Sequence, residues 1–129
     1  MSVRRARRGS NAIEFAMLAP VFLAILSGIV DLGVYFARLD QLSAIARDAA
    51  RLGAVTDAND GPSKVAQVDA EEALKERGFS AKVSATLGGA APDKWVKVEL
   101  WMEPTVTFGL LPMPSTVHAE ATMRLEDQE

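Results

Sequence analysis

Few side chains in this 129-residue sequence could carry out catalysis or hold a metal ion. There is no cysteine, which excludes disulfide bonds, thiol nucleophiles and cysteine-ligated metal sites. The only histidine, His118, lies among polar and small residues without a second histidine to complete a ligand set. Glu71, Glu72 and Glu76 are close in sequence, but no histidine or lysine cluster accompanies them as acid–base partners. We therefore expect no catalytic, cofactor-binding or metal-binding residues, with His118 on the surface or in a strand and the glutamates on a solvated helix face.

Glu14 has the clearest chemical role, because a long apolar run begins directly after it. An ionisable side chain at a membrane boundary is costly, and it is usually retained because it has a partner. This segment resembles the processing site of type IV prepilins, and the resemblance implies a cut after Gly9 that would create a cation, the new amino group of Ser10, on the same helix end. Glu14 would then pair with the Ser10 amine of a neighbouring subunit, or it would lie in water at the level of the lipid headgroups. The sequence leaves both interpretations open.

These residues are positioned by a basic head and a long apolar segment. The basic residues of the head are Arg4, Arg5, Arg7 and Arg8. They orient the chain, because positive flanking residues are held in the cytoplasm. No charged residue occurs in residues 15–30, and apolar character resumes after Asp31. Since a span needs about 20 mainly apolar residues, we predict a cytoplasmic leader over residues 1–9, a transmembrane helix over residues 10–37 and an exported C-terminal domain.

Three kinds of membrane segment fit this layout. A cleavable secretory signal requires small residues at its cleavage site, and residues 25–29 match that pattern poorly. An uncleaved signal anchor fits the apolar run but gives no reason for Gly9 and Glu14. The third kind is the processing site of type IV prepilins, which this segment resembles: a membrane peptidase cuts after a glycine, and a glutamate is fifth in the mature chain. Gly9, Ser10 and Glu14 have that spacing.

Small residues recur at four-residue spacing along the predicted span, which would let neighbouring helix backbones approach closely. They are Ala12, Ala16, Pro20, Ala24 and Gly28. This helix-packing interpretation competes with the abundance of small residues in any membrane helix. Pro20 is also expected to bend the helix. Asp31 follows sixteen uncharged residues, so we interpret it as the outer boundary of the span rather than as a contact with a partner.

The helical pattern continues beyond the membrane to Arg51. Its apolar stripe comprises Leu39, Leu42, Ile45, Ala46, Ala49, Ala50 and Leu52. Residues 38–54 are therefore expected to form the outer half of the same helix, ending at Gly53. A second amphipathic helix is predicted over residues 63–77, after Pro62 and closed by Gly78. Its expected apolar face comprises Val65, Val68, Ala73 and Leu74.

Alternating apolar and polar residues predict three antiparallel strands over residues 81–87, 95–103 and 115–125. The turn GGAAPD joins the first two strands into a hairpin. A sheet with one apolar face needs a cover, which the outer half of the long helix and the second helix would supply. Residues 55–129 are therefore predicted to be a small α+β domain, so the fold class of the chain is α+β.

Two surface features could contact partners. Trp101 shares the polar face of its strand with Trp95, where it would be either an exposed anchor or packed over the sheet. The loop over residues 108–114, FGLLPMP, is unusually apolar for a connection. It could touch the membrane, a neighbouring subunit or its own sheet, and we expect it to pack on its own sheet. Nucleic acid is excluded as a partner, because the chain behind the basic leader is acidic.

The first 55 residues resemble the TadE-like family, whose members are membrane-anchored components of tight-adherence (Tad) pili. The residues that carry the resemblance are Glu14, Phe15, Pro20, Asp31, Ala49, Ala50, Arg51 and Gly53. It implies a pilin-like fold and a role in pilus assembly, initiation or adhesion. It also implies a prepilin peptidase that recognises Glu14 and Phe15 and cuts between Gly9 and Ser10.

Membrane lipid, other pilin or pseudopilin subunits and an inner-membrane assembly platform are the further partners that the resemblance implies. The sheet domain is typical of minor rather than major pilins of this kind. Ser10 departs from the phenylalanine that opens many mature type IV pilins, which favours a Tad-dedicated peptidase. The alternatives are an uncleaved, signal-anchored envelope protein whose exported domain binds other envelope proteins, and a membrane-tethered enzyme that uses the carboxylates.

Overall fold

The structure, a computed structural model, describes residues 6–90 and 92–126, with side chains from Asn11 onward except that of Ala58. The described chain forms two compact units. One comprises the helix as far as Val34 together with Thr105–Met113, and the other comprises Tyr35–Pro104 and the chain from Pro114 onward. The elements are an α+β set, as predicted: two α-helices, a short 3-10 helix and three strands.

Helix α1 is a single element, Ala6–Ala54, which includes Pro20. It contains the predicted span and its continuation, because the amphipathic stretch after the apolar run has no residue that ends a helix. Of the predicted outer stripe, Leu42, Ile45, Ala46, Ala49 and Ala50 are buried. Leu52 is wrongly predicted, since 41 % of it is exposed.

Gly53 lies inside α1, one residue before its end, and it has a different role from the predicted helix-ending glycine. A Cβ atom at this position would lie 2.9 Å from the Pro62 carbonyl oxygen, 2.9 Å from Ala66 Cβ and 3.3 Å from Val96 Cγ1. The backbone of Gly53 does not adopt the left-handed conformation typical of helix-ending glycines. Gly53 therefore provides room for α1 to approach its neighbours.

Helix α2 spans Pro62–Glu76, with Pro62 in its first turn as predicted. It follows a 3-10 helix, Ala58–Asp60, in which the Asp57 side chain accepts a hydrogen bond from Asn59 N. Two hydrogen bonds close α2: Gly78 N donates to Lys75 O at 3.1 Å and Phe79 N donates to Leu74 O at 2.8 Å. This pairing is the Schellman motif, so Gly78 ends the helix as predicted.

The buried stripe of α2 consists of residues at strict four-residue spacing: Pro62, Ala66, Ala70 and Leu74. The predicted apolar face is wrong for Val68, which is 54 % exposed. Val68 is two residues from Ala66 and from Ala70, and two residues correspond to about 200° of rotation around a helix. It therefore lies on the opposite side of α2 from the buried alanines.

The sheet has the order β1-β2-β3 and is antiparallel throughout. Its strands are β1, Ala81–Gly88, β2, Trp95–Met102, and β3, Val117–Arg124. The register places Val98 opposite Ala85 in β1 and opposite Ala121 in β3. The predicted hairpin and the alternation in β2 are confirmed, with buried and half-buried residues alternating along the strand. At the end of the edge strand β1, Leu87 is 48 % exposed.

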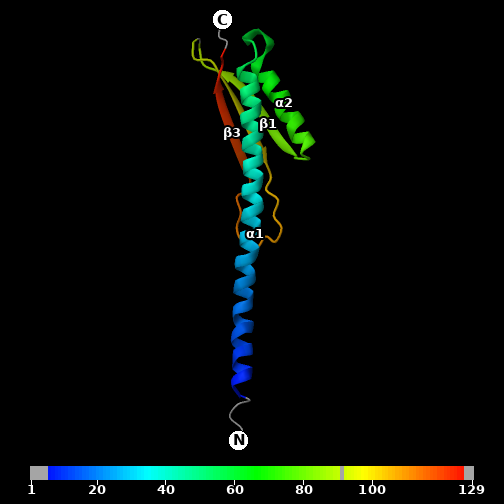
Figure 1. Cartoon of the computed structure of the whole chain (residues 1–129), viewed down its shortest axis with the longest axis vertical. Helices are drawn as coiled ribbons and strands as arrows, with labels where there is room; N and C mark the ends of the chain where they lie inside the picture. Colours follow the sequence, from blue (N-terminus) through cyan, green and yellow to red (C-terminus); the bar gives the residue numbers. More distant parts are fainter. Residues whose placement is uncertain (1–5, 91, 127–129) are drawn as a thin grey trace. The chain divides into compact units, whose positions relative to one another are not determined.

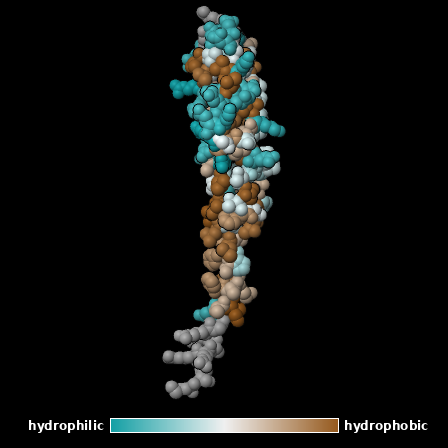
Figure 2. Space-filling model, turned by 90° about the vertical axis from the view of Figure 1, so that its right-hand side faces the viewer, coloured by the Kyte–Doolittle hydropathy of each residue, from teal (hydrophilic) through white to brown (hydrophobic). Residues whose placement is uncertain are grey.

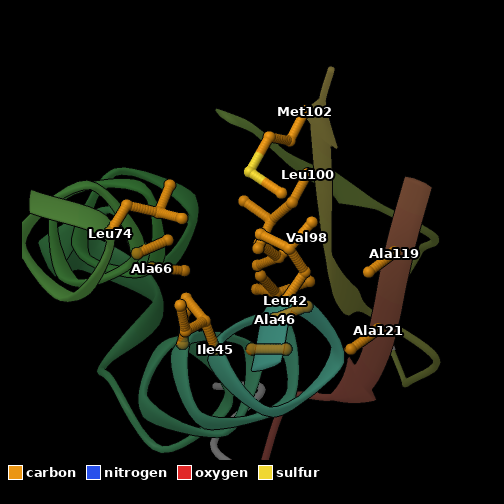
Figure 3. Packing of buried hydrophobic residues seen from close by; sticks show 14 of the residues in the cluster. Leu42, Ile45, Ala46, Ala66, Leu74, Val98, Leu100, Met102, Ala119 and Ala121 are labelled. Atoms are coloured by element: carbon orange, nitrogen blue, oxygen red, sulfur yellow. The ribbon is translucent and has the colours of Figure 1, made fainter. Parts of the chain in front are cut away.

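The two helices cover the apolar face of the sheet, as predicted (Figure 3). Leu42, Ile45 and Ala46 of α1 face Val98 and Leu100 of β2 in one buried cluster. Ala66 and Leu74 of α2 belong to the same buried cluster. Figure 1 shows α2 and the strands beside the later part of α1. Many of the helical contacts are alanines, which lets helix and sheet backbones approach closely.

We predict that Gly53→Ala destabilises the α+β domain. Crowding against the Pro62 carbonyl oxygen costs about 1–3 kcal/mol, which exceeds the helix-propensity gain of at most about 1 kcal/mol. Thermal unfolding of the full chain in detergent, followed by tryptophan fluorescence, measures the change. Gly33→Ala is the control, because nothing lies within 4 Å of a Cβ atom at Gly33. Equal unfolding midpoints for the two variants would contradict the close-packing role of Gly53.

Candidate functional site

The predicted processing site lies at the start of the described chain. Arg4 and Arg5 are outside the described residues, and the side chains of Arg7, Arg8 and Ser10 are outside them too. The backbone is helical from Ala6, so Gly9 and Ser10 lie within α1. The cut between them and the orienting role of the arginines stay predictions.

Glu14 and Phe15 are both exposed on α1, and Phe15 is 71 % exposed. A peptidase or a neighbouring helix could reach either side chain. The small residues predicted as a packing surface differ along the helix. Ala12, Ala16 and Pro20 are exposed, Ala24 is half-buried and Gly28 is buried. Their role in packing between subunits stays a prediction.

Gly28 is covered by a segment of its own chain. A Cβ atom at Gly28 would overlap Leu111 Cδ1. Leu111 belongs to Thr105–Met113, the connection between β2 and β3 that forms one unit with the first part of α1. We call this connection the β2–β3 loop. The prediction that the loop packs on its own sheet is therefore wrong, because it packs on α1.

The contact between the loop and α1 is centred on Asp31, which is 0 % exposed. Thr107 N donates a hydrogen bond to Asp31 Oδ1 at 2.8 Å, and Phe108 N donates to the same oxygen at 3.1 Å. Gly109 N donates to Asp31 Oδ2 at 3.0 Å. The sequence left a membrane boundary or a contact with a partner open for Asp31, and the structure shows a contact with another part of its own chain. The boundary position stays a prediction.

The local conformation of the loop makes this binding possible. Three successive amide groups converge on one carboxylate, which is the arrangement of a backbone anion site. Gly109 has a φ angle of 67°, a left-handed conformation that glycine adopts without steric cost. A buried carboxylate without partners is strongly destabilising, and hydrogen bonds to an ionised acceptor are stronger than those between neutral groups. Asp31 and residues 107–109 therefore fix one another.

The face of α1 beside Asp31 suits a close approach of the loop. Ser27 is 6 % exposed, and its hydroxyl donates to Ala24 O at 3.0 Å. Ser27, Gly28 and Asp31 occupy one side of the helix, because residues three and four apart are neighbours there. A small hydroxyl and a glycine leave room for the loop. The hydroxyl of Ser27 is satisfied locally and does not take part in binding the loop.

The outward side of the loop is apolar. Val106 is 44 % exposed, Phe108 57 %, Leu110 62 % and Leu111 42 %. The loop therefore presents polar backbone groups to Asp31 and hydrophobic side chains outward.

The polar face of the sheet carries an ion-pair network. Lys97 Nζ lies 3.0 Å from Glu99 Oε1 and 2.9 Å from Glu120 Oε2. The hydrogen bonds that Lys97 donates, above all the one to Glu120, raise the pKa of Lys97, and the same bond to Glu120 lowers the pKa of that carboxyl group. His118 Nε2 lies 3.8 Å from Glu99 Oε1. The ring of His118 stacks on that of Trp101, with centroids 5.3 Å apart.

This arrangement bears on two predictions from the sequence. Glu99, His118 and Glu120 bring ligand atoms within 4.8 Å of one another, but the Lys97 ammonium already binds both carboxylates. We interpret the cluster as a salt-bridge network rather than an open ligand set. The stacking on His118 favours packing of Trp101 over the sheet instead of an exposed anchor.

Among the described residues, one helix, within α1, is long and apolar enough to cross a membrane. With the domain that follows, it defines an α+β protein with a long apolar N-terminal helix. A model of the TadE-like protein family matches residues 9–51, which confirms the resemblance over that segment. The matched segment runs from the predicted cut site past Asp31. No curated protein and no solved structure matches the chain.

We predict that the Lys97 network contributes stability over a defined pH range. Folding lowers the pKa of Glu120 below 4.5. The stability that Glu120 adds to the folded state is therefore complete above pH 4.5 and is lost as the pH falls through the folded-state pKa. Folding raises the pKa of Lys97 above 10.5. The stability that Lys97 adds to the folded state is therefore complete below pH 10.5 and is lost as the pH rises through the folded-state pKa. The measurement is the unfolding midpoint of the full chain and of Lys97→Met against pH. A difference in unfolding midpoint between the two proteins that becomes smaller neither at low pH nor at high pH would contradict this prediction.

Proposed function

We propose that this chain is a minor pilin or pseudopilin of a Tad-type type IV pilus. It would be a single-pass protein of the cytoplasmic membrane, with a cytoplasmic N-terminus and an exported α+β domain. Its work would be pilus assembly, initiation or adhesion rather than catalysis. The observation that carries this proposal is the TadE-like match over residues 9–51, because it starts at the predicted cut site and includes the anchor helix.

The first step would be processing by a prepilin peptidase between Gly9 and Ser10. The exposure of Glu14 and Phe15 supports this step, since both side chains are open to recognition from the membrane side. The apolar residues that follow are also exposed, among them Met17 at 74 % and Phe22 at 60 %. Such a surface suits lipid before assembly and neighbouring helices after it.

The second step would be pairing between subunits. Glu14 lies four residues beyond the new N-terminus, or about 6 Å along a helix. The amine of Ser10 on one helix would therefore meet Glu14 of a neighbour displaced by about one helical turn. Pairing would neutralise two charges that are costly at the edge of an apolar bundle. Ala12 and Ala16, both exposed, would allow the helices to come close near this pair.

We predict that co-expression with a Tad-dedicated prepilin peptidase yields a mature chain that begins at Ser10. Intact mass analysis of the purified protein measures the N-terminus. Without the peptidase, the chain should keep its leader, which is the control. A chain that retains Met1 or Ser2 in the presence of a peptidase active on other subunits would reject processing and favour the uncleaved, signal-anchored alternative.

We predict that Glu14→Ala lowers assembly with other pilin subunits about ten- to hundredfold, the effect of losing about 1.5–3 kcal/mol from a charged hydrogen bond. Glu14→Asp should retain part of it. Co-purification of pilin subunits after membrane solubilisation gives the measurement. Asp40→Asn is the control, because Asp40 is also an exposed acid on α1. Normal processing and normal co-purification of Glu14→Ala would reject the pairing.

A further inference from the structure

The β2–β3 loop combines features that a solvent-exposed connection rarely has. The nine residues Thr105–Met113 include no charged residue. Phe108 and Leu110 are 57 % and 62 % exposed. In water, such side chains on a surface loop form an exposed apolar patch, and patches of this kind mark sites that bind a protein or a membrane.

The position of Asp31 along α1 indicates how deep in a bilayer the β2–β3 loop would lie. Asp31 lies seventeen residues beyond Glu14, which is about 26 Å along a helix. The hydrocarbon core of a bilayer is about 30 Å thick. If Glu14 marks the cytoplasmic boundary, Asp31 lies within the outer part of the hydrocarbon region. The residues of the loop that bind Asp31 lie at the same depth.

At that depth, the contact between Asp31 and the loop lowers the free-energy cost of burying each of them in the membrane. Irregular backbone is tolerated in a membrane only where its polar groups have partners. The N–H groups of Thr107, Phe108 and Gly109 have one in the Asp31 carboxylate, at 2.8–3.1 Å. The carboxylate is in turn 0 % exposed and accepts three hydrogen bonds. In a membrane, a carboxylate on an apolar helix and a turn with unbonded amides would each cost free energy, and the hydrogen bonds between them remove most of that cost.

The surface around the loop points to lipid rather than protein as its partner. The neighbouring part of α1 exposes apolar side chains as well, such as Leu26 at 57 % and Ile29 at 61 %. Figure 2 shows hydrophobic residues gathered over the first half of α1. Apart from the buried Asp31, residues 15–37 have no charge. A protein interface usually has a polar rim around its apolar centre, and this surface lacks charged groups that would form one.

We propose that the β2–β3 loop is a second membrane-inserted segment of this protein. It enters the outer leaflet against α1, held by Asp31, and its Phe108 and Leu110 side chains contact lipid acyl chains. The loop joins β2 to β3, so the exported domain is tied to the membrane by this segment as well as by α1. The proposal rests on membrane insertion of α1 and does not depend on processing or pilus assembly.

The test is the depth of a spin label on the loop. The chain has no cysteine, so single substitutions give single labelling sites. Leu110→Cys in the full chain is labelled with a nitroxide and reconstituted into vesicles of phosphatidylethanolamine and phosphatidylglycerol. Collision with oxygen, which concentrates in lipid, is compared with collision with a water-soluble nickel chelate. Phe22→Cys in the span and Val68→Cys on α2 are the matched references, since both native side chains are exposed.

The expected result is a Leu110 label that favours oxygen as the Phe22 label does, with loss of the nickel accessibility seen at Val68. Nickel accessibility equal to that at Val68 would overturn the proposal. Shielding from both reagents would overturn it as well, because it would identify a protein partner such as a second copy of this chain. A Phe22 label in lipid with a Leu110 label in water rejects the loop alone. A Phe22 label in water rejects the membrane span on which the proposed function also depends.

Variants of Asp31 test what holds the loop, in the same labelled background. Asp31→Ala removes all three acceptor contacts and should bring the Leu110 label to the nickel accessibility of Val68. Asp31→Asn keeps an oxygen for Thr107 and Phe108 but can place its amide nitrogen toward Gly109, so an intermediate value is expected. Ser27→Ala is the control, because the Ser27 hydroxyl bonds only within α1. A label that stays in lipid in Asp31→Ala would overturn the role of Asp31.

Discussion

A carboxylate buried against an apolar helix must have hydrogen-bond donors, and this requirement organises the first unit of the protein. Asp31 obtains its donors from three consecutive amides of the β2–β3 loop. The loop in turn needs Gly109 in a left-handed conformation and a face of α1 with small residues, where Gly28 makes room for Leu111. Removing the carboxylate would leave these amides without an acceptor, at a cost of about 1–3 kcal/mol for each one that stays buried.

The α+β domain depends on the close approach of helix and sheet backbones rather than on large side chains. Among the described residues, five alanines of the two helices belong to the buried cluster: Ala46, Ala49, Ala50, Ala66 and Ala70. Gly53 allows a close approach of α1 to Pro62 and Val96. The later part of α1 is therefore a wall of the domain as well as a continuation of the apolar helix. This dual use explains why the helix has no breaker where the apolar run ends.

Local patterns predicted most of the fold. Alternation in β2 identified its buried face, Pro62 and Gly78 marked the ends of α2, and the absence of a breaker predicted one continuous α1. Val68 was misplaced because the middle of the buried stripe of α2 consists of two alanines, Ala66 and Ala70, and alanine carries a weaker hydrophobic signal than valine. The Lys97–Glu120 contact follows from the pairing of β2 with β3, which a single strand does not reveal.

The Asp31 contact could not be predicted for a different reason. Its partners are 76 to 78 residues away, and they are backbone amides, which every residue except proline has. The two halves of the site were each visible, as an acid inside an apolar run and as an unusually apolar loop. Their connection required the path of the chain in space.

The most direct measurement of the central contact is hydrogen exchange at the amides of Thr107, Phe108 and Gly109, resolved by NMR in the full chain in lipid nanodiscs. If Asp31 holds the loop, these three amides exchange slowly in the native chain and rapidly in Asp31→Ala, while amides of the sheet are unchanged. Exchange at all three positions in the native chain as fast as at exposed loop amides would contradict the account.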